Sequence, residues 1–137
     1  MDGLGKIKKK GLIVMITDLR LDQNILDKVK CESVLLICDA LGKDITKIIL
    51  YGSCSRGDFS DDSDIDIALI VDCDRTEINK YSDLLAEVAT KLATKYLAIV
   101  NFVCLPEKEF EERKEWYPYY KNIDREGELL YGRQVLQ

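Results

Sequence analysis

Residues 64–71, with the sequence DIDIALIV, constrain the fold of this chain more than any other stretch. Successive side chains of a β-strand point to opposite faces of its sheet, so Asp64 and Asp66 share one face. The other face is aliphatic throughout and carries Ile65, Ile67, Leu69 and Val71. The pattern predicts a strand that buries one face in a core and holds two carboxylates together near its start.

The segment before this strand favours a tight turn. Residues 48–51 form a short apolar run, which predicts a buried strand, and Gly52 and Ser53 follow it directly. Glycine lets the backbone approach a ligand closely, and the following amides and the serine hydroxyl can face an anion. Residues 53–57 are expected to form a turn or a single helical turn, in which Arg56 either holds phosphate or braces the polar loop at 58–63. A phosphate cradle close to an acid pair indicates nucleotide chemistry.

The rest of the chain alternates between helical and strand patterns. Helical periodicity predicts helices over residues 22–41, 74–96, 106–114 and 118–127. Strands are expected at residues 98–104 and, at a sheet edge, 129–131. Gly42 suits a helix end, Asp74 with Glu77 resembles a capping box, and Pro106 suits a first helical position. This order predicts an α/β (α+β) domain, a sheet with helices packed on it.

Composition limits the classes of function. The 137 residues contain no histidine, which excludes histidine acid–base catalysis and histidine-bound zinc. The net charge of −5 argues against extensive nucleic-acid binding through a basic face. None of the five cysteines forms a C-x-x-C pair, and this usage is typical of a reducing, cytoplasmic location. The apolar run at residues 12–16 is too short to span a membrane. We expect an N-terminal extension at 1–21 and one domain at 22–137.

The two carboxylates have the spacing of a metal site. Asp64 and Asp66 should lie about 6–7 Å apart along the strand. They can grip one divalent ion together or share two ions roughly 4 Å apart. Magnesium prefers such oxygen ligands and takes its remaining ligands from water and phosphates. The alternatives are a solvated acid pair at a strand edge, or a structural metal site without nucleotide, which would leave the Gly-Ser turn unexplained.

Residues 52–66, GSCSRGDFSDDSDID, resemble the G-S-x-x-R-G…D-x-D signature of the DNA-polymerase-β-like nucleotidyltransferase superfamily. The chain is most similar to the minimal nucleotidyltransferases, small proteins often paired with HEPN-domain partners in toxin–antitoxin modules. The similarity extends over roughly residues 26–131 and includes the ending REGELLYG. It implies a polymerase-β-like fold, with a small mixed β-sheet flanked by helices.

The resemblance also implies a reaction. Gly52 and Ser53, with Arg56 beside them, would hold the triphosphate of an NTP, most simply ATP. Asp64 and Asp66 would bind two Mg²⁺ (or Mn²⁺) ions, and a hydroxyl would accept AMP as pyrophosphate leaves. The acceptor would be a tyrosine of a HEPN-type partner or a small molecule. The chain shows no second domain to hold a bulky acceptor, which favours a partner-supplied acceptor or a homodimer.

One position departs from the family pattern. The family usually adds a third carboxylate from a neighbouring strand, and the only polar residue in residues 98–104 is Asn101. Its amide can offer an oxygen to a metal, but it carries no charge and cannot accept a proton at neutral pH. Two hypotheses follow: an enzyme whose catalytic set is Asp64, Asp66 and Asn101, or a catalytically weak nucleotide-binding partner protein or antitoxin.

Three further features of the sequence carry expectations. Cys54 begins the predicted helical turn, where a thiolate is favoured, so a nucleophilic role is a minor alternative. An aromatic cluster is expected to pack helix against sheet, with an exposed subset as the alternative partner or dimer surface; it comprises Trp116, Tyr117, Tyr119 and Tyr120. The charge run at residues 107–115 is interpreted as the solvated face of a helix.

Overall fold

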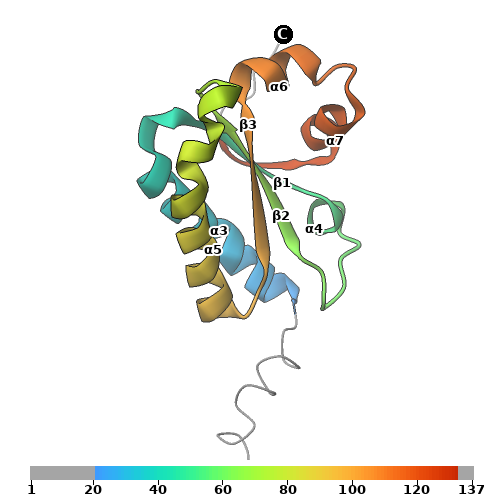
Figure 1. The fold of residues 1–137 in the computed structure, drawn as a ribbon. Helices are drawn as coiled ribbons and strands as arrows, with labels where there is room; N and C mark the ends of the chain where they lie inside the picture. Colours follow the sequence, from blue (N-terminus) through green and yellow to red (C-terminus); the bar gives the residue numbers. More distant parts are fainter. Residues whose placement is uncertain (1–20, 133–137) are drawn as a thin grey trace, which may run out of the picture.

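The computed structural model describes residues 21–132. Its centre is a four-stranded mixed sheet in the order β3-β2-β1-β4 (Figure 1). Strand β1 (Ile45–Tyr51) pairs antiparallel with β2 (Ile65–Val71) and with β4 (Glu128–Gly132). Strand β3 (Val100–Pro106) runs parallel to β2. The predicted mixed sheet with flanking helices is confirmed, whereas the predicted extension at residues 1–21, apart from Leu21, lies outside the described residues.

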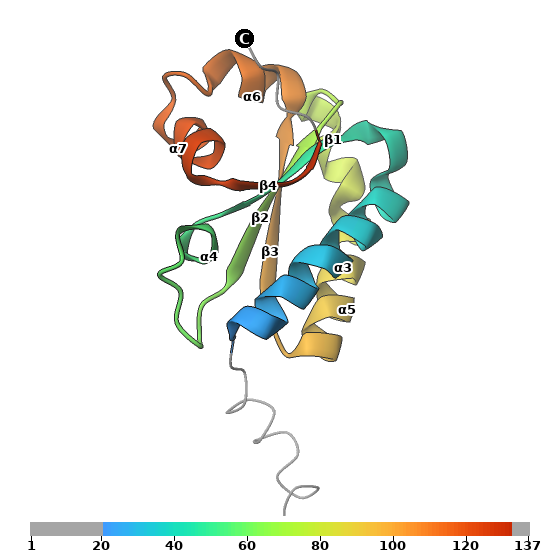
Figure 2. The ribbon, with the colours of Figure 1, turned by 180° about the vertical axis from the view of Figure 1, so that it is seen from behind.

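Helices cover the two faces of the sheet unequally. The long helices α3 (Gln23–Leu41) and α5 (Ser82–Tyr96) lie side by side on one face, as Figures 1 and 2 show. Among residues 21–132, the opposite face is covered only at one end, by α6 (Glu107–Arg113) and α7 (Pro118–Glu126). The single-turn helix α4 (Ser53–Arg56) flanks the other end of that face. The sheet therefore leaves part of one face uncovered, between α7 and α4.

Each face has its own core. Ile65, Ile67 and Leu69 are fully buried against α3 and α5, which confirms the core face predicted for this strand. The other face of β2 is also buried at Ala68 and Ile70, beneath α6 and α7. The sequence pattern had assigned only one face to a core. Because the second core begins at Ala68, the acid pair lies just below its edge.

Several helix boundaries follow the predicted signals. The Asp22 side chain accepts a hydrogen bond from the Ile25 amide at 2.8 Å and caps α3. Gly42 ends that helix with φ +59°, a conformation that glycine adopts without strain. Pro118 occupies the first turn of α7 and Gly127 ends it. The predicted end at Gly42 and the predicted helix at residues 118–127 are confirmed because each depends only on chemistry within one helical turn, whereas the Asp22 cap had not been predicted.

Two boundary predictions are wrong. Residues 74–96 do not form one helix: a 3₁₀-helix, Arg75–Tyr81, precedes α5, and the Asp74 side chain makes no capping bond. Tyr81 at the junction is buried and donates a hydrogen bond to Asp44 at 2.6 Å, which ties this turn to the residue just before β1. Pro106 is the last residue of β3 and the N-cap of α6, because the parallel ladder with β2 runs through to that residue. Within the described range, no helix has both the length and the apolar character needed to cross a membrane.

Candidate active site

The sheet register brings Asp66, Asn101 and Tyr51 into one row. Asp66 is the ladder partner of Asn101 on β3 and of Tyr51 on β1. Directly paired residues of neighbouring strands project to the same face, with Cβ atoms about 4.5–5.5 Å apart. Asp64 lies two residues before Asp66, just ahead of β2, and joins the group. The row is the first level of this face beyond the core that α6 and α7 cover.

Asn101 bridges the two carboxylates. Its Nδ2 atom donates to Asp64 Oδ2 and to Asp66 Oδ1, each at 3.2 Å. The strand alignment that placed Asn101 beside the acid pair is therefore correct. Oxygens of both carboxylates converge on one amide nitrogen, so they also converge on a point where a cation could lie.

The donor set fits a hard divalent cation held by few protein ligands. Within residues 21–132, no three His, Cys, Asp or Glu side chains are grouped closely enough to hold a metal ion. Rotation of the Asn101 side chain would present its Oδ1 atom in place of Nδ2, giving two carboxylates and one neutral oxygen. Magnesium and manganese accept such a set and complete it with water and phosphate oxygens.

Gly52 lies directly against Asp66. Its φ of +78° and ψ of −155° belong to a region that is open essentially to glycine alone. A Cβ atom at this position would lie 3.0 Å from Asp66 Oδ2. The amides of Ser55 and Arg56 donate to the Gly52 carbonyl, which closes α4. The predicted turn is confirmed, and the glycine is required both by its backbone and by its approach to the carboxylate.

Arg56 braces the loop in this structure. Its Nε atom donates to Asp58 Oδ2 at 3.3 Å, and its Nη1 atom lies 3.9 Å from Glu126 Oε1 at the end of α7. The sequence left two roles open for Arg56, phosphate binding and bracing of the loop, and these contacts correspond to the second. The guanidinium is nevertheless about half exposed and lies one turn from Ser53, so a phosphate role remains a proposal.

Cys54 does not have the surroundings of a nucleophile. The side chain is buried, with Sγ 3.6 Å from the Asp64 carbonyl oxygen. Burial, followed by the charge of Asp66, raises the pKa of the thiol. A raised pKa disfavours the thiolate, so the structure argues against the nucleophilic alternative.

Tyr51 is a site residue that the sequence reasoning missed. Its hydroxyl lies 3.2 Å from that of Tyr119 on α7, and the two rings meet edge to face with centroids 6.2 Å apart. Burial raises the pKa of Tyr51, and the Tyr119 hydrogen bond and the charge of Asp66 raise it further. The signal in the sequence was its place directly before Gly52, where antiparallel pairing of the two strands sets it opposite Asp66.

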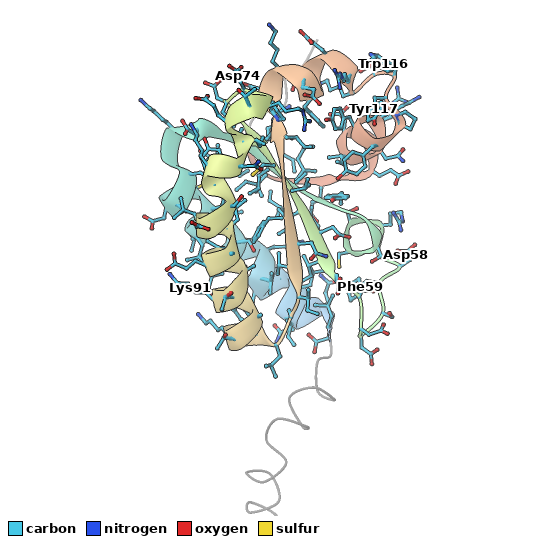
Figure 3. The ribbon with its side chains drawn as sticks, in the orientation of Figure 1. Asp58, Phe59, Asp74, Lys91, Trp116 and Tyr117 are labelled. Atoms are coloured by element: carbon cyan, nitrogen blue, oxygen red, sulfur yellow. The ribbon has the colours of Figure 1, made fainter. Side chains whose placement is uncertain are left out.

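The aromatic cluster divides into buried and exposed members. Only Tyr120 is buried, packed on Phe110 with ring centroids 5.8 Å apart. Trp116, Tyr117 and Tyr119 are 64%, 41% and 43% exposed, and Figure 3 shows the first two at the connection between α6 and α7. The prediction that the cluster packs helix against sheet is therefore confirmed for Tyr120, and in part for Tyr119, which is exposed but also meets Tyr51 of β1. The alternative, an exposed subset, describes the others.

The charge run of α6 is not simply solvated. Glu109 accepts two hydrogen bonds from Arg75, at 2.9 and 2.6 Å, and one from Tyr120 at 2.6 Å. The Arg75 bonds, with that of Tyr120, lower the pKa of Glu109 to about 2. Glu111 pairs with the largely buried Lys47 at 3.2 Å. The interpretation of residues 107–115 as a solvated face was wrong for these two carboxylates, which tie α6 to the rest of the domain.

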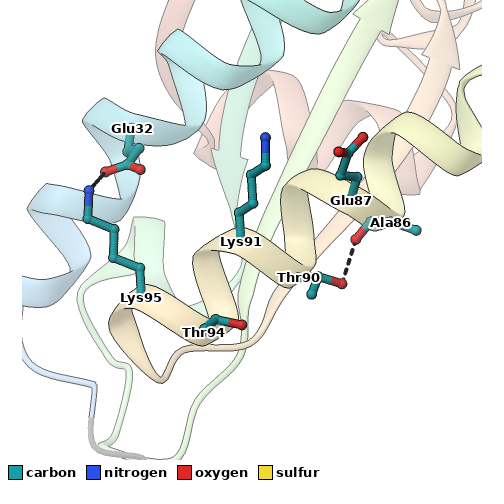
Figure 4. Close-up of a pocket in the computed structure, with 7 residues that line it drawn as sticks. All are labelled: Glu32, Ala86, Glu87, Thr90, Lys91, Thr94 and Lys95. Atoms are coloured by element: carbon teal, nitrogen blue, oxygen red, sulfur yellow. Dashed lines mark hydrogen bonds and ion pairs between the residues drawn. The ribbon is translucent and has the colours of Figure 1, made fainter.

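A second hollow lies on the far side of the sheet. It is lined by residues of α3 and α5, including Glu32, Thr90 and Lys95 (Figure 4). Two of its polar pairs are internal: Lys95 donates to Glu32 at 2.9 Å, and Thr90 donates to the Ala86 carbonyl at 2.8 Å. The sheet separates this hollow from the acid pair, so the two do not form one site.

Comparisons with known proteins agree with this geometry. A protein of Methanocaldococcus jannaschii that carries the provisional name protein adenylyltransferase is 37% identical over 87 residues, which cover 64% of this chain and 79% of that protein. A crystal structure of a toxin–antitoxin with AMP-PNP has a similar fold, with a TM-score of 0.52 and 24% identity over 77% of this chain and 74% of that one. A mutant MntA–HpeT toxin–antitoxin structure also has a TM-score of 0.52, with 23% identity over 77% of this chain and 74% of that one.

The family assignment rests on the sequence profile of the nucleotidyltransferase domain. This profile matches residues 31–128, which include strands β1, β2 and β3, the first residue of β4, the Gly-Ser turn and the acid pair. The resemblance found in residues 52–66 is thereby confirmed over most of the chain. The protein belongs to the nucleotidyltransferase domain family.

Proposed function

We propose that this protein transfers AMP from ATP to a hydroxyl group of an acceptor, with Mg²⁺ or Mn²⁺ bound to Asp64 and Asp66. The observation that carries the proposal is the convergence of both carboxylates beside the Gly52 turn. The choice of AMP is supported by the provisional name of the M. jannaschii relative, protein adenylyltransferase. The toxin–antitoxin structure with AMP-PNP supports ATP as the nucleotide.

Each site residue has a proposed role. Asp64 and Asp66 hold the divalent ion, and Asn101 rotates its amide so that Oδ1 becomes a neutral third ligand. A bound ion would offset phosphate charge and favour ionisation of the acceptor hydroxyl. Gly52 and Ser53 receive the triphosphate through backbone amides and the serine hydroxyl. Arg56 turns from Asp58 towards the phosphates, a change that needs only a side-chain rotation because its present partner is exposed.

Asn101 sets the expected rate. A site with two carboxylates and one amide carries one negative charge fewer than a site with three carboxylates, so it holds a divalent ion less tightly. An amide also cannot accept the proton that an acceptor hydroxyl loses. We therefore expect slow transfer, and we expect Asn101→Asp to accelerate it.

A second candidate function follows from the same residue. Because Asn101 donates to both carboxylates, the site is internally satisfied without a cation. This favours, as the alternative, a catalytically weak protein that binds nucleotide and acts as the antitoxin of a partner. Under either function we propose that residues 22–137 form the functional domain and that the protein is cytoplasmic. We also propose that a HEPN-domain protein is the partner that supplies the acceptor. The other arrangement is a homodimer that forms the acceptor site itself.

The test is transfer of label from ATP labelled at the α-phosphate, with Mg²⁺ or Mn²⁺, in lysate that contains any neighbouring partner. The wild type is compared with Asn101→Asp and with the double variant Asp64→Asn/Asp66→Asn. Transfer that the double variant abolishes supports an enzyme, and the labelled species identifies the acceptor. Transfer by Asn101→Asp alone supports the catalytically weak alternative. If label transfer by the wild type survives in the double variant, the proposed metal site is wrong.

A further inference from the structure

A boundary between covered and exposed residues crosses the face of the sheet that carries the acid pair. One row along this face, Ala68 pairs with Ile49 and Val103, all three apolar, and α6 and α7 cover this level. The next row is Asn101, Asp66 and Tyr51. Asn101 is exposed, whereas Tyr51 packs against the edge of the covered core. Tyr51 therefore stands where the covered core ends and the acid pair begins.

Tyr119 extends this boundary outward. It comes from α7, 68 residues along the chain from Tyr51, and its ring meets the Tyr51 ring edge to face. It is 43% exposed, and behind it lies the buried Tyr120, with ring centroids 5.8 Å apart. Tyr120 is itself held by its hydrogen bond to Glu109. Tyr119 is thus an exposed ring on a fixed support, beside the acid pair rather than remote from it.

The chemistry of the neighbouring surfaces decides what this ring pair could bind. The loop at 58–63, which leads into Asp64, carries three carboxylates, Asp58, Asp61 and Asp62, its one aromatic residue, Phe59, packs against the core under α3 and α5, and the β3 side offers the polar Asn101. Only the Tyr51 side presents paired aromatic rings with hydroxyl groups. Aromatic side chains bind nucleobases by stacking, at about 1–3 kcal/mol per base, and tyrosine hydroxyls can hydrogen-bond to a ribose.

Chain connectivity supplies the remaining argument. Tyr51 immediately precedes Gly52 and is the ladder partner of Asp66, so a nucleotide whose phosphates lie at Gly52, Ser53 and the acid pair would lie next to the Tyr51 ring. We propose that Tyr51 and Tyr119 form the subsite that binds the nucleoside part of the nucleotide. This inference rests on the proposed function, since it takes the position of the phosphates from it. The tyrosine pair would make the protein bind a nucleotide more tightly than a bare polyphosphate.

The experiment compares two ligands and two matched variants. Binding of AMP-PNP and of inorganic tripolyphosphate is measured by calorimetry in Mn²⁺, with Tyr119→Ala and Tyr117→Ala. Tyr117 is the control because its exposure of 41% is close to that of Tyr119 and its ring also packs on Tyr120, at 5.1 Å. We expect Tyr119→Ala to weaken AMP-PNP binding about 10-fold or more and to leave tripolyphosphate unchanged. Tyr117→Ala should change neither.

The outcomes separate this inference from the function on which it rests. If Tyr119→Ala weakens the binding of AMP-PNP and of tripolyphosphate equally, or leaves the affinity for AMP-PNP unchanged, the tyrosine subsite is overturned. Binding of AMP-PNP by the wild type would still support the nucleotide site in that case. If the wild type binds neither ligand, the nucleotide site and the subsite both fail. Photolabelling of the wild type with 8-azido-ATP needs no variant. Label is expected on Tyr51 or Tyr119, and label confined to residues 58–63 or β3 would contradict the inference.

Discussion

Substitution of Gly52 by alanine should damage both the fold and the acid pair. A second glycine, Gly57, provides a matched comparison because it ends the same single-turn helix and has almost the same φ, +81° against +78°. The two differ in ψ, which is 7° at Gly57 and −155° at Gly52. They differ also in surroundings: a Cβ atom at Gly57 would meet nothing within 4 Å, whereas one at Gly52 would lie 3.0 Å from Asp66 Oδ2.

These differences set the expected magnitudes. Gly57→Ala places alanine in the left-handed region, at a cost of about 1–2 kcal/mol. Gly52→Ala places it in a region open essentially to glycine, at about 1–3 kcal/mol, and rotation of the Asp66 side chain adds about 0.5–1.5 kcal/mol. Alanine also lowers the entropy of the unfolded chain, but by a similar amount in both variants. We expect Gly52→Ala to lose about 2–4 kcal/mol, roughly 1–2 kcal/mol more than Gly57→Ala.

The assay is urea unfolding of both variants together with Mn²⁺ binding followed by electron paramagnetic resonance. Because the new methyl group displaces an Asp66 oxygen, Gly52→Ala should weaken Mn²⁺ binding about 10-fold, in line with the effect of disturbing the support of a metal ligand. Gly57→Ala should leave Mn²⁺ binding unchanged. Equal stability and equal Mn²⁺ affinity in the two variants would refute the argument that Gly52 is placed by its contact with Asp66.

Three further predictions test the core, the ion pair and the buried thiol. Phe110→Ala should lower the free energy of unfolding by about 3–5 kcal/mol in urea titrations, because the ring is fully buried between α6 and the sheet. The Arg75 bonds lower the folded-state pKa of Glu109 to about 2, from 4.5, so the ionised Glu109 stabilises the fold fully above pH 4.5 and this stabilisation is lost as the pH falls towards 2. Glu109→Gln should remove this pH dependence from the free energy of unfolding measured between pH 2 and 4.5. An unchanged dependence in the variant would contradict the ion pair. Iodoacetamide at pH 8 should modify the exposed Cys31 well before the buried Cys54, as measured by mass spectrometry of peptides, and the reverse order would be inconsistent with the raised pKa of Cys54.

The sequence by itself determined the features that depend on short spacings. The alternation in β2 depends on neighbours two residues apart, and the end of α3 at Gly42 depends on one turn of helix. The Gly52 turn and the acid pair of Asp64 and Asp66 likewise lie within a single stretch of 15 residues, 52–66. Such features are set by local backbone geometry, which is why a pattern in the sequence is sufficient to predict them.

Only the tertiary structure decided what lies around the acid pair. The contact of Tyr51 with Tyr119 spans 68 residues and depends on helix placement that no local pattern encodes. The contact of Asn101 with Asp66 spans 35 residues, and its prediction needed the resemblance to a family in which a neighbouring strand supplies a third ligand. The exposure of Tyr119 and the burial of Tyr120, one residue apart, follow from which side of α7 faces the sheet. The sequence therefore predicts the acid pair that we propose as the cation site, whereas the packing of α7 onto the sheet decides which surface lies beside it.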